Sequence, residues 1–150
     1  PVIEYGLRWL AARIPRPGRR VLVHGDYRIG NVLFGPEGVR VILDWEQAHV
    51  GDPMEDLGWM CVRAWRFGSP LPVGGIGERD EFFRAYERAG GDAVDPEVVR
   101  FWEAFGDLKW AVICIVQAKR YLDGGVKSVE LASIGRRTAE AEYDLLALMD

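Results

Sequence analysis

Oxygen-bearing side chains stand in two short stretches of the chain, where their types and spacing suit the binding of a metal ion. Asp26 and Asn31 lie five residues apart in "VLVHGDYRIGN", and Asp44 and Glu46 follow in "ILDWE". Carboxylate and amide oxygens with no cysteine or paired histidine close by suit a hard cation such as Mg²⁺. Because protein-bound Mg²⁺ commonly shares its coordination with substrate phosphates, the pattern favours phosphate chemistry.

A short antiparallel hairpin is expected to bring the two stretches together. Residues 21–24 have the pattern of a buried strand. The segment "NVLFGPEGVRVILDWE" then holds two apolar runs on either side of the turn-forming residues 35–38, which is typical of a β-hairpin. Both polar stretches therefore lie at strand ends, and we expect Asp26, Asn31 and Asp44 to converge on one cleft.

Two interpretations of Glu46 remain open. If residues 44–46 continue a strand, alternation returns the Glu46 side chain to the same face as Asp44, where it would reach a second metal directly or through water. The alternative is a solvated glutamate at the end of the hairpin.

Helical patterns surround this β element. Apolar residues recur at helical spacing, and Pro and Gly mark the ends of the segments. The fold class is therefore α+β and mostly α-helical, with a small antiparallel β element that carries the unusual polar residues. Helices are expected over residues 2–14, from 52 to about 66, over 78–89, from 95 through at least 116 as a buried central helix, and over 131–148.

Composition and charge exclude several classes of protein. The chain has 150 residues, 49% of them hydrophobic and 28% charged, as expected for one folded domain. A net charge of -4, with scattered Lys and Arg, argues against a nucleic-acid partner. No apolar run is long enough to span a membrane. Cys61 and Cys114 stand alone, which favours buried thiols in a reducing cytoplasm.

The two polar stretches also carry a family resemblance. "HGDYRIGN" followed by "ILDWEQAHVGDPMEDLGW" resembles the aminoglycoside phosphotransferase and choline kinase-like family, distant relatives of the protein kinases. Within this family, the sequence of the two motifs is most similar to that of the phosphotransferase-like domains found with acyl-CoA dehydrogenases. The match is close over residues 21–59. It implies the C-terminal lobe of a protein kinase-like fold, with Mg²⁺ and ATP (or GTP) as cofactors and a small-molecule hydroxyl as acceptor.

The resemblance also implies roles for individual residues. Asp26 matches the catalytic aspartate that orients the acceptor hydroxyl and takes up its proton. Asn31 and Asp44 match the residues that bind the metal and, through it, the nucleotide phosphates. Arg28 lies where protein kinases place a lysine that contacts the transferred phosphate; a surface ion pair is the alternative.

Neighbouring polar residues receive structural interpretations. In the family the histidine at the position of His24 packs and hydrogen bonds within the catalytic loop, and the aspartate at Asp56 holds the loop backbone. Asp52 precedes Pro53 and is expected to cap the next helix. His49 receives no role.

The chain departs from the family in one respect. The resemblance implies an N-terminal nucleotide-binding lobe, and nothing before residue 21 matches it. Because the chain begins with Pro1 rather than Met, we expect a missing upstream segment. Residues 1–150 would then be the C-terminal lobe alone, with weak nucleotide binding, no activity of its own and an apolar face that favours a homo-oligomer.

Other classes of function stay open beside this one. A kinase-like lobe that serves only in binding or assembly is the main alternative. A two-metal phosphoesterase ranks low, since such a site normally needs a histidine directly after the asparagine, and Val32 stands there.

Overall fold

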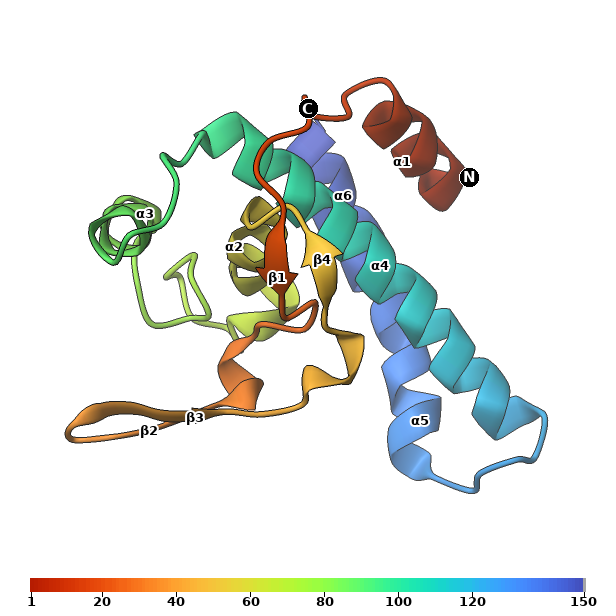
Figure 1. The fold of residues 1–150 in the computed structure, drawn as a ribbon. Helices are drawn as coiled ribbons and strands as arrows, with labels where there is room; N and C mark the ends of the chain where they lie inside the picture. Colours follow the sequence, from red (N-terminus) through yellow and green to blue (C-terminus); the bar gives the residue numbers. More distant parts are fainter. Residues whose placement is uncertain (150) are drawn as a thin grey trace. The chain divides into compact units, whose positions relative to one another are not determined.

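Helices make up most of the chain, and short antiparallel strands lie between residues 21 and 51, which confirms the predicted fold class (Figure 1). The computed structural model describes residues 1–149. Contacts divide these residues into two compact units. One comprises Pro1–Arg13 and the chain from Ala104 onward, and the other is Ile14–Glu103. Every candidate site residue belongs to the second unit.

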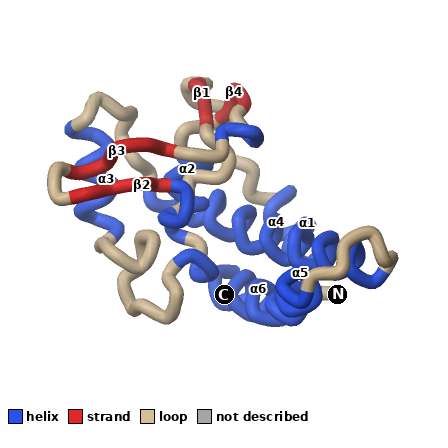
Figure 2. The backbone as a smooth tube through the Cα atoms, turned by 90° about the horizontal axis from the view of Figure 1, so that it is seen from below, coloured by secondary structure: helices blue, strands red, loops and turns tan. Residues whose placement is uncertain are grey.

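The strands of the second unit pair in two separate ladders within the described residues (Figure 2). Strand β1 (Val21–Val23) pairs with β4 (His49–Gly51), and β2 (Val32–Gly35) pairs with β3 (Gly38–Ile42). The β2–β3 hairpin is the one predicted from the turn sequence. It extends as an arm away from helix α2 (Figure 1).

Both faces of this hairpin carry exposed apolar side chains. Leu33 lies opposite Val41, and after a register shift Phe34 lies opposite Val39. Their exposed fractions run from 45% for Val41 to 62% for Val39. A two-stranded ribbon has no second layer of its own to cover these faces.

Helix α2 (Met54–Cys61) forms the centre of the core of the second unit. A Cβ added at Gly58 would lie 2.6 Å from the Cβ of Trp102 and 2.7 Å from the backbone nitrogen of Glu103, so only glycine permits this close helix packing. Helix α3 (Arg79–Arg88) adds Phe83 to the same core. The buried cluster consists of Val32, Met54, Leu57, Met60, Cys61, Val73, Phe83 and Val99.

The second predicted helix begins as expected and ends early. The carboxylate of Asp52 accepts a hydrogen bond from the Met54 backbone nitrogen at 2.9 Å, which confirms its capping role. The prediction that the helix reaches residue 66 is wrong, because Val62 is extended and the guanidinium of Arg66 hydrogen bonds the Cys61 carbonyl. A short 3₁₀ turn, η3 (Arg63–Trp65), follows.

The first unit consists of helices, and the long helix α4 (Pro96–Leu122) is buried on one face. Helix α1 (Val2–Ala11) ends three residues before the predicted limit, and Pro15 disfavours helical backbone at the residue before it. Helix α4 buries Ala111 and Cys114, but Val112, Ile115 and Val116 are exposed. The expectation that α4 is buried on most sides is therefore wrong for its C-terminal half.

The C-terminal helical segment is also interrupted. Helix α5 (Val129–Ile134), the 3₁₀ turn η4 (Gly135–Arg137) and helix α6 (Thr138–Met149) replace the single predicted helix. A Cβ at Gly135 would lie 2.5 Å from the Cβ of Ala118, so the 3₁₀ turn packs against α4 at a position where only glycine fits. Among the described residues, no helix has both the length and the apolar character needed to cross a membrane. Both cysteines are buried and unpaired, as predicted.

Candidate functional site

The carboxylate of Asp26 is held by donors from its own loop and from α2. The Asn31 side-chain nitrogen donates to Oδ2 of Asp26 at 2.7 Å and to the Asp26 carbonyl at 2.9 Å. Arg28 donates from Nε to the same Oδ2 at 3.3 Å. The indole of Trp59 donates to the other oxygen, Oδ1, at 2.8 Å. Three of the predicted site residues, Asp26, Arg28 and Asn31, are therefore in direct contact.

Tight backbone turns produce this contact. Gly25 has φ of +77°, and a Cβ there would lie 2.6 Å from the Gln47 carbonyl oxygen, so glycine is required. After Arg28, the 3₁₀ turn η1 (Ile29–Asn31) reverses the chain and returns Asn31 to Asp26. Asn31 is only 2% exposed, which makes its hydrogen bonds part of the core.

Asp56 on α2 holds the backbone of the loop, as the sequence predicted. Its Oδ2 accepts from the His24 backbone nitrogen at 2.7 Å, and its Oδ1 accepts from the Gly25 nitrogen at 2.9 Å. Burial raises the pKa of Asp56 above its usual value, against the opposing effect of these two donors and of nearby histidines. The helix therefore anchors the loop through a partly buried carboxylate.

His24 connects the loop to the end of the hairpin. Its Nδ1 accepts a hydrogen bond from the Asp26 backbone nitrogen at 3.1 Å, so the ring proton of neutral His24 is on Nε2. Nε2 then donates to the Leu43 carbonyl at 2.8 Å, and the Leu43 nitrogen donates to the Asn31 carbonyl at 2.8 Å. These contacts bring the backbone next to Asp44 to the loop that carries Asp26.

Asp44 is an exposed residue with left-handed backbone, φ 62° and ψ 59°. Non-glycine residues adopt this conformation at a free-energy cost, and such residues are common at functional sites. The chain then enters the 3₁₀ turn η2 (Trp45–Gln47). The argument that strand alternation returns Glu46 to the face of Asp44 is therefore wrong, because residues 44–46 do not form a strand.

Arg28 is half-buried rather than a free surface cation. Its guanidinium carbon lies 5.3 Å from the centre of the Trp65 ring, and its ion pair is with Asp26 itself. Trp65 packs in turn against Trp59, with ring centroids 5.2 Å apart. The two tryptophans and Arg28 thus form one side of the Asp26 site.

The donor set at this site suits a hard cation. Because the Asn31 amide nitrogen faces Asp26, its Oδ1 points away from that carboxylate, and Asp44 adds an exposed carboxylate. Over residues 1–149, no group of three or more His, Cys, Asp or Glu is arranged to hold a metal ion. The predicted set of Asn31, Asp44 and Glu46 holds only two such residues, so the metal assignment remains a prediction.

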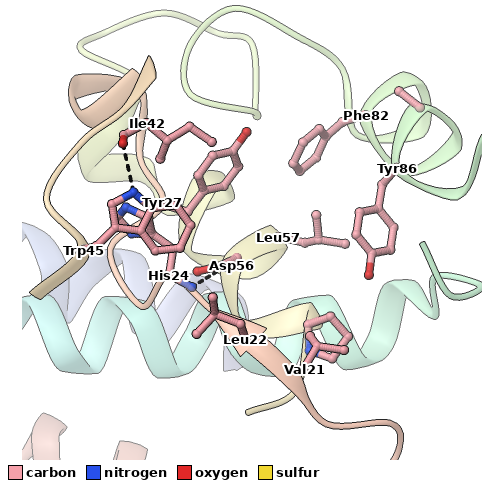
Figure 3. A pocket seen from close by; sticks show the side chains of 12 residues that line it. Val21, Leu22, His24, Tyr27, Ile42, Trp45, Asp56, Leu57, Phe82 and Tyr86 are labelled. Carbon is pink, nitrogen blue, oxygen red and sulfur yellow. Dashed lines mark hydrogen bonds between the residues drawn. The ribbon is translucent and has the colours of Figure 1, made fainter. Parts of the chain in front are cut away.

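A cavity of about 370 Å³ lies beside a different set of side chains. Figure 3 shows the rings of Tyr27, Phe82 and Tyr86 around it, with Asp56 and His24 nearby. Burial, with a smaller contribution from the charge of Asp56, raises the pKa of the Tyr27 phenol. Within the described residues, the lining includes His24 and Tyr27 on either side of Asp26 but not Asp26, Arg28, Asn31 or Asp44, so the cavity lies beside the loop of Asp26.

The sequence analysis missed the role of two tryptophans and of one buried acid. Trp59 and Trp65 are 3% and 6% exposed and contact Asp26 and Arg28 as described above. Glu55 is also buried and lies 3.1 Å from Nε2 of His49. One signal was available for Trp59, because it follows Asp56 by three residues and so lies on the same helix face.

Comparison with known proteins places this geometry in a family. The sequence model of the phosphotransferase enzyme family matches residues 2–102. The chain belongs to that family. Its structure is similar to that of a protein from Ralstonia eutropha JMP134 assigned as an aminoglycoside phosphotransferase, with a TM-score of 0.79 and 26% identity over 99% of this chain and 49% of that one. The chain thus has the family membership and the kinase-like fold of phosphotransferases.

Further similarities come from a solved complex and from curated sequences. A thermostable mutant of aminoglycoside phosphotransferase APH(4)-Ia, in complex with AMP-PNP and hygromycin B, shares the fold at a TM-score of 0.59 and 21% identity, over 99% of this chain and 42% of that one. Acyl-CoA dehydrogenase family member 10 of Mus musculus is 33% identical over 96% of this chain. Member 11 of Homo sapiens is 31% identical over 97%. The chain spans only 15% and 20% of those two relatives.

Proposed function

We propose that this chain carries the acceptor-side and metal-binding part of a small-molecule kinase, which moves the γ-phosphoryl group of ATP or GTP to a hydroxyl. The observation that supports this most is the contact between the Asn31 amide and the Asp26 carboxylate, within motifs of the phosphotransferase family. The AMP-PNP and hygromycin B complex of the structural neighbour supports a nucleoside triphosphate donor and a small-molecule acceptor.

In this proposal Asp26 orients the acceptor hydroxyl. The hydroxyl oxygen forms a bond to the γ-phosphorus as the bond from that phosphorus to the β,γ-bridging oxygen breaks, and the hydroxyl proton passes to the Asp26 carboxylate. The step asks little of the carboxylate as a base, because phosphoryl transfer depends mainly on positioning and charge stabilisation. The side chain of Asp26 is 14% exposed, so a small part of it is accessible to a substrate.

Asn31 and Asp44 would hold Mg²⁺, with Glu46 as a further candidate ligand. When bound, Mg²⁺ neutralises charge on the nucleotide phosphates. Arg28 supplies a fixed positive charge next to Asp26, where it would attract a phosphate oxygen or an acidic acceptor. His24 and Asp56 keep the loop in place through the contacts described above.

The chain would be the C-terminal lobe of a larger kinase-like protein. This proposal is supported by coverage, because the chain matches nearly its full length to less than half of each solved neighbour. A second candidate function is a kinase-like lobe used in binding or assembly. The observation that favours it is the β2–β3 hairpin, whose exposed apolar faces are suited to contact with another surface.

The test uses the longest natural polypeptide that contains this chain, with γ-labelled ATP or GTP and Mg²⁺. Hygromycin B and hydroxyacyl-CoA thioesters serve as acceptors, the latter because the curated relatives are acyl-CoA dehydrogenase family members, and hydrolysis measures transfer to water. Asp26→Asn should lower kcat by at least about 100-fold with nearly unchanged nucleotide affinity.

Asp80→Asn is the matched control, because Asp80 is an exposed acid on α3. This variant should retain wild-type kcat. The proposal fails if the wild-type protein transfers no phosphoryl group to any acceptor or to water, or if Asp26→Asn retains wild-type turnover.

A further inference from the structure

The two oxygens of the Asp26 carboxylate have different surroundings. Oδ2 accepts from Asn31 at 2.7 Å and from Arg28 at 3.3 Å, whereas Oδ1 accepts from the Trp59 indole at 2.8 Å. A carboxylate oxygen has two lone pairs. Both lone pairs of Oδ2 are engaged, and Oδ1 keeps one for a further donor.

Trp59 is itself firmly placed. It is 3% exposed, packs against Trp65 and lies on α2, the same helix that holds the loop backbone through Asp56. The preceding residue, Gly58, brings α2 into close contact with the first turns of α4. The indole N–H is therefore a donor on a fixed helix, 33 residues away from the carboxylate that it contacts.

Rotation of the Asp26 side chain is opposed on both sides. A turn about χ2 that freed Oδ1 from Trp59 would also move Oδ2 away from Asn31 and Arg28. The carboxylate plane is thus set by α2 on one side and by the loop on the other, and the open lone pair of Oδ1 has a fixed direction.

We propose that Trp59 is a positioning residue for phosphoryl transfer, whose indole N–H orients Oδ1 of Asp26 as the atom that receives the acceptor hydroxyl. The inference rests on the proposed function and deepens it, since it names the reacting oxygen and the group that aims it. Loss of the N–H leaves Asp26 with its loop donors only, so the acceptor hydroxyl is held less accurately. Nucleotide binding does not involve Trp59 and should not change.

The kinetic test removes the indole N–H of Trp59 in two ways, one that also changes the shape of the ring and one that keeps it. Trp59→Phe removes the donor and part of the ring. Replacement of Trp59 by the isostere β-(3-benzothienyl)alanine keeps the bicyclic ring and replaces only the N–H by sulfur. In the longest natural polypeptide, the isostere should lower kcat by about 10-fold to 100-fold with little change in the KM of nucleotide or acceptor.

Trp102→Phe is the matched control, because Trp102 also donates its indole N–H to an aspartate, Asp52, at 3.1 Å. It should leave kcat within about twofold of wild type. A second readout needs no activity. In the 150-residue chain, the indole ¹H–¹⁵N resonance of Trp59 should move on Asp26→Ala, and that of Trp102 should stay in place.

The possible results distinguish a failure of the role of Trp59 from a failure of the proposed function. A wild-type protein without any phosphoryl transfer overturns the proposed function and, with it, this inference. An active wild-type protein whose isostere variant keeps full kcat overturns the role of Trp59 alone. An indole resonance of Trp59 that does not move on Asp26→Ala also overturns the role of Trp59, because the hydrogen bond would then be absent.

Discussion

Nε2 of His24 lies 2.8 Å from the carbonyl oxygen of Leu43, and this hydrogen bond joins the loop of Asp26 to the residue just before Asp44. Because Nδ1 of the same ring accepts from the Asp26 nitrogen, one neutral imidazole connects the two motifs. The acceptor-side aspartate and the proposed metal-binding aspartate are therefore linked through this buried side chain, in addition to the backbone hydrogen bond from Leu43 to Asn31.

Replacing His24 by Phe should disturb this connection while keeping an aromatic ring against Trp45, whose ring centroid lies 4.6 Å away. The Asp26 N–H and the Leu43 carbonyl lose their partner, and an unsatisfied buried polar group costs about 1–3 kcal/mol. Urea unfolding should show a loss of stability of that order. Unchanged stability in His24→Phe would contradict the connecting role.

Asp44 allows a pair of substitutions that separates backbone from carboxylate. Asp44→Gly and Asp44→Ala both remove the proposed metal ligand, so both should abolish Mg²⁺-dependent turnover. Since φ is 62° there, the Gly variant should be about 1 kcal/mol more stable than the Ala variant. Thermal unfolding measures the difference. Persistent Mg²⁺-dependent turnover in either variant would argue against the metal assignment.

The raised pKa of Asp56 predicts how stability depends on pH. Below the ordinary value of 3.8, Asp56 is protonated in both the folded and the unfolded chain. As the pH rises toward the higher folded pKa, the unfolded chain loses this proton first, so the stability that Asp56 contributes falls. The stability of wild type relative to Asp56→Asn should therefore decline as the pH rises above 3.8 toward the raised folded pKa. A relative stability that rises with pH instead would contradict the raised pKa of Asp56.

The two cysteines should be inert in the folded chain. Burial raises the pKa of Cys61 to about 12 and also raises that of Cys114. Alkylation requires the thiolate and access to it. At about pH 8, labelling followed by mass measurement should therefore show no modification of the native chain and two modifications after unfolding in urea. Labelling of the native chain would contradict the burial of these thiols.

The exposed hairpin predicts self-association of the isolated 150-residue chain. Light scattering should show a dimer or larger species, because contact between hairpins removes Phe34 and Val39 from water. Val39→Glu should shift the chain toward monomer. Val129→Glu is the matched control, since Val129 is also exposed but lies on α5. A wild-type chain that stays monomeric would count against this use of the hairpin.

Local signals were sufficient for the elements next to the site. The turn residues 35–38 and their apolar flanks specify the β2–β3 hairpin, and Asp52 with Pro53 marks the start of α2. Side-chain and inter-helix contacts accompany the features that were missed. The guanidinium of Arg66 hydrogen bonds the Cys61 carbonyl at the end of α2, and Gly135 lies against Ala118 of α4 where a 3₁₀ turn interrupts the C-terminal helix.

The contacts among the candidate residues could be predicted only in part from the sequence. Asp26, Arg28 and Asn31 meet because their turn is local, within six residues. The expected strand over residues 44–46 was wrong because the sequence pattern does not reveal a left-handed residue at Asp44. Trp59 was missed because its partner lies on a loop 33 residues earlier in the chain.

The left-handed backbone at Asp44 gives a way to sort relatives of this chain into catalysts and binders. Glycine adopts that conformation without the steric penalty that a side chain brings. In a lineage that no longer transfers phosphate, replacement of this aspartate would therefore stabilise the fold. Glycine or asparagine should become common at this position. If Asp44 binds the metal as proposed, relatives that transfer phosphate must keep this carboxylate, so this position should separate active kinases from relatives that retain only the fold.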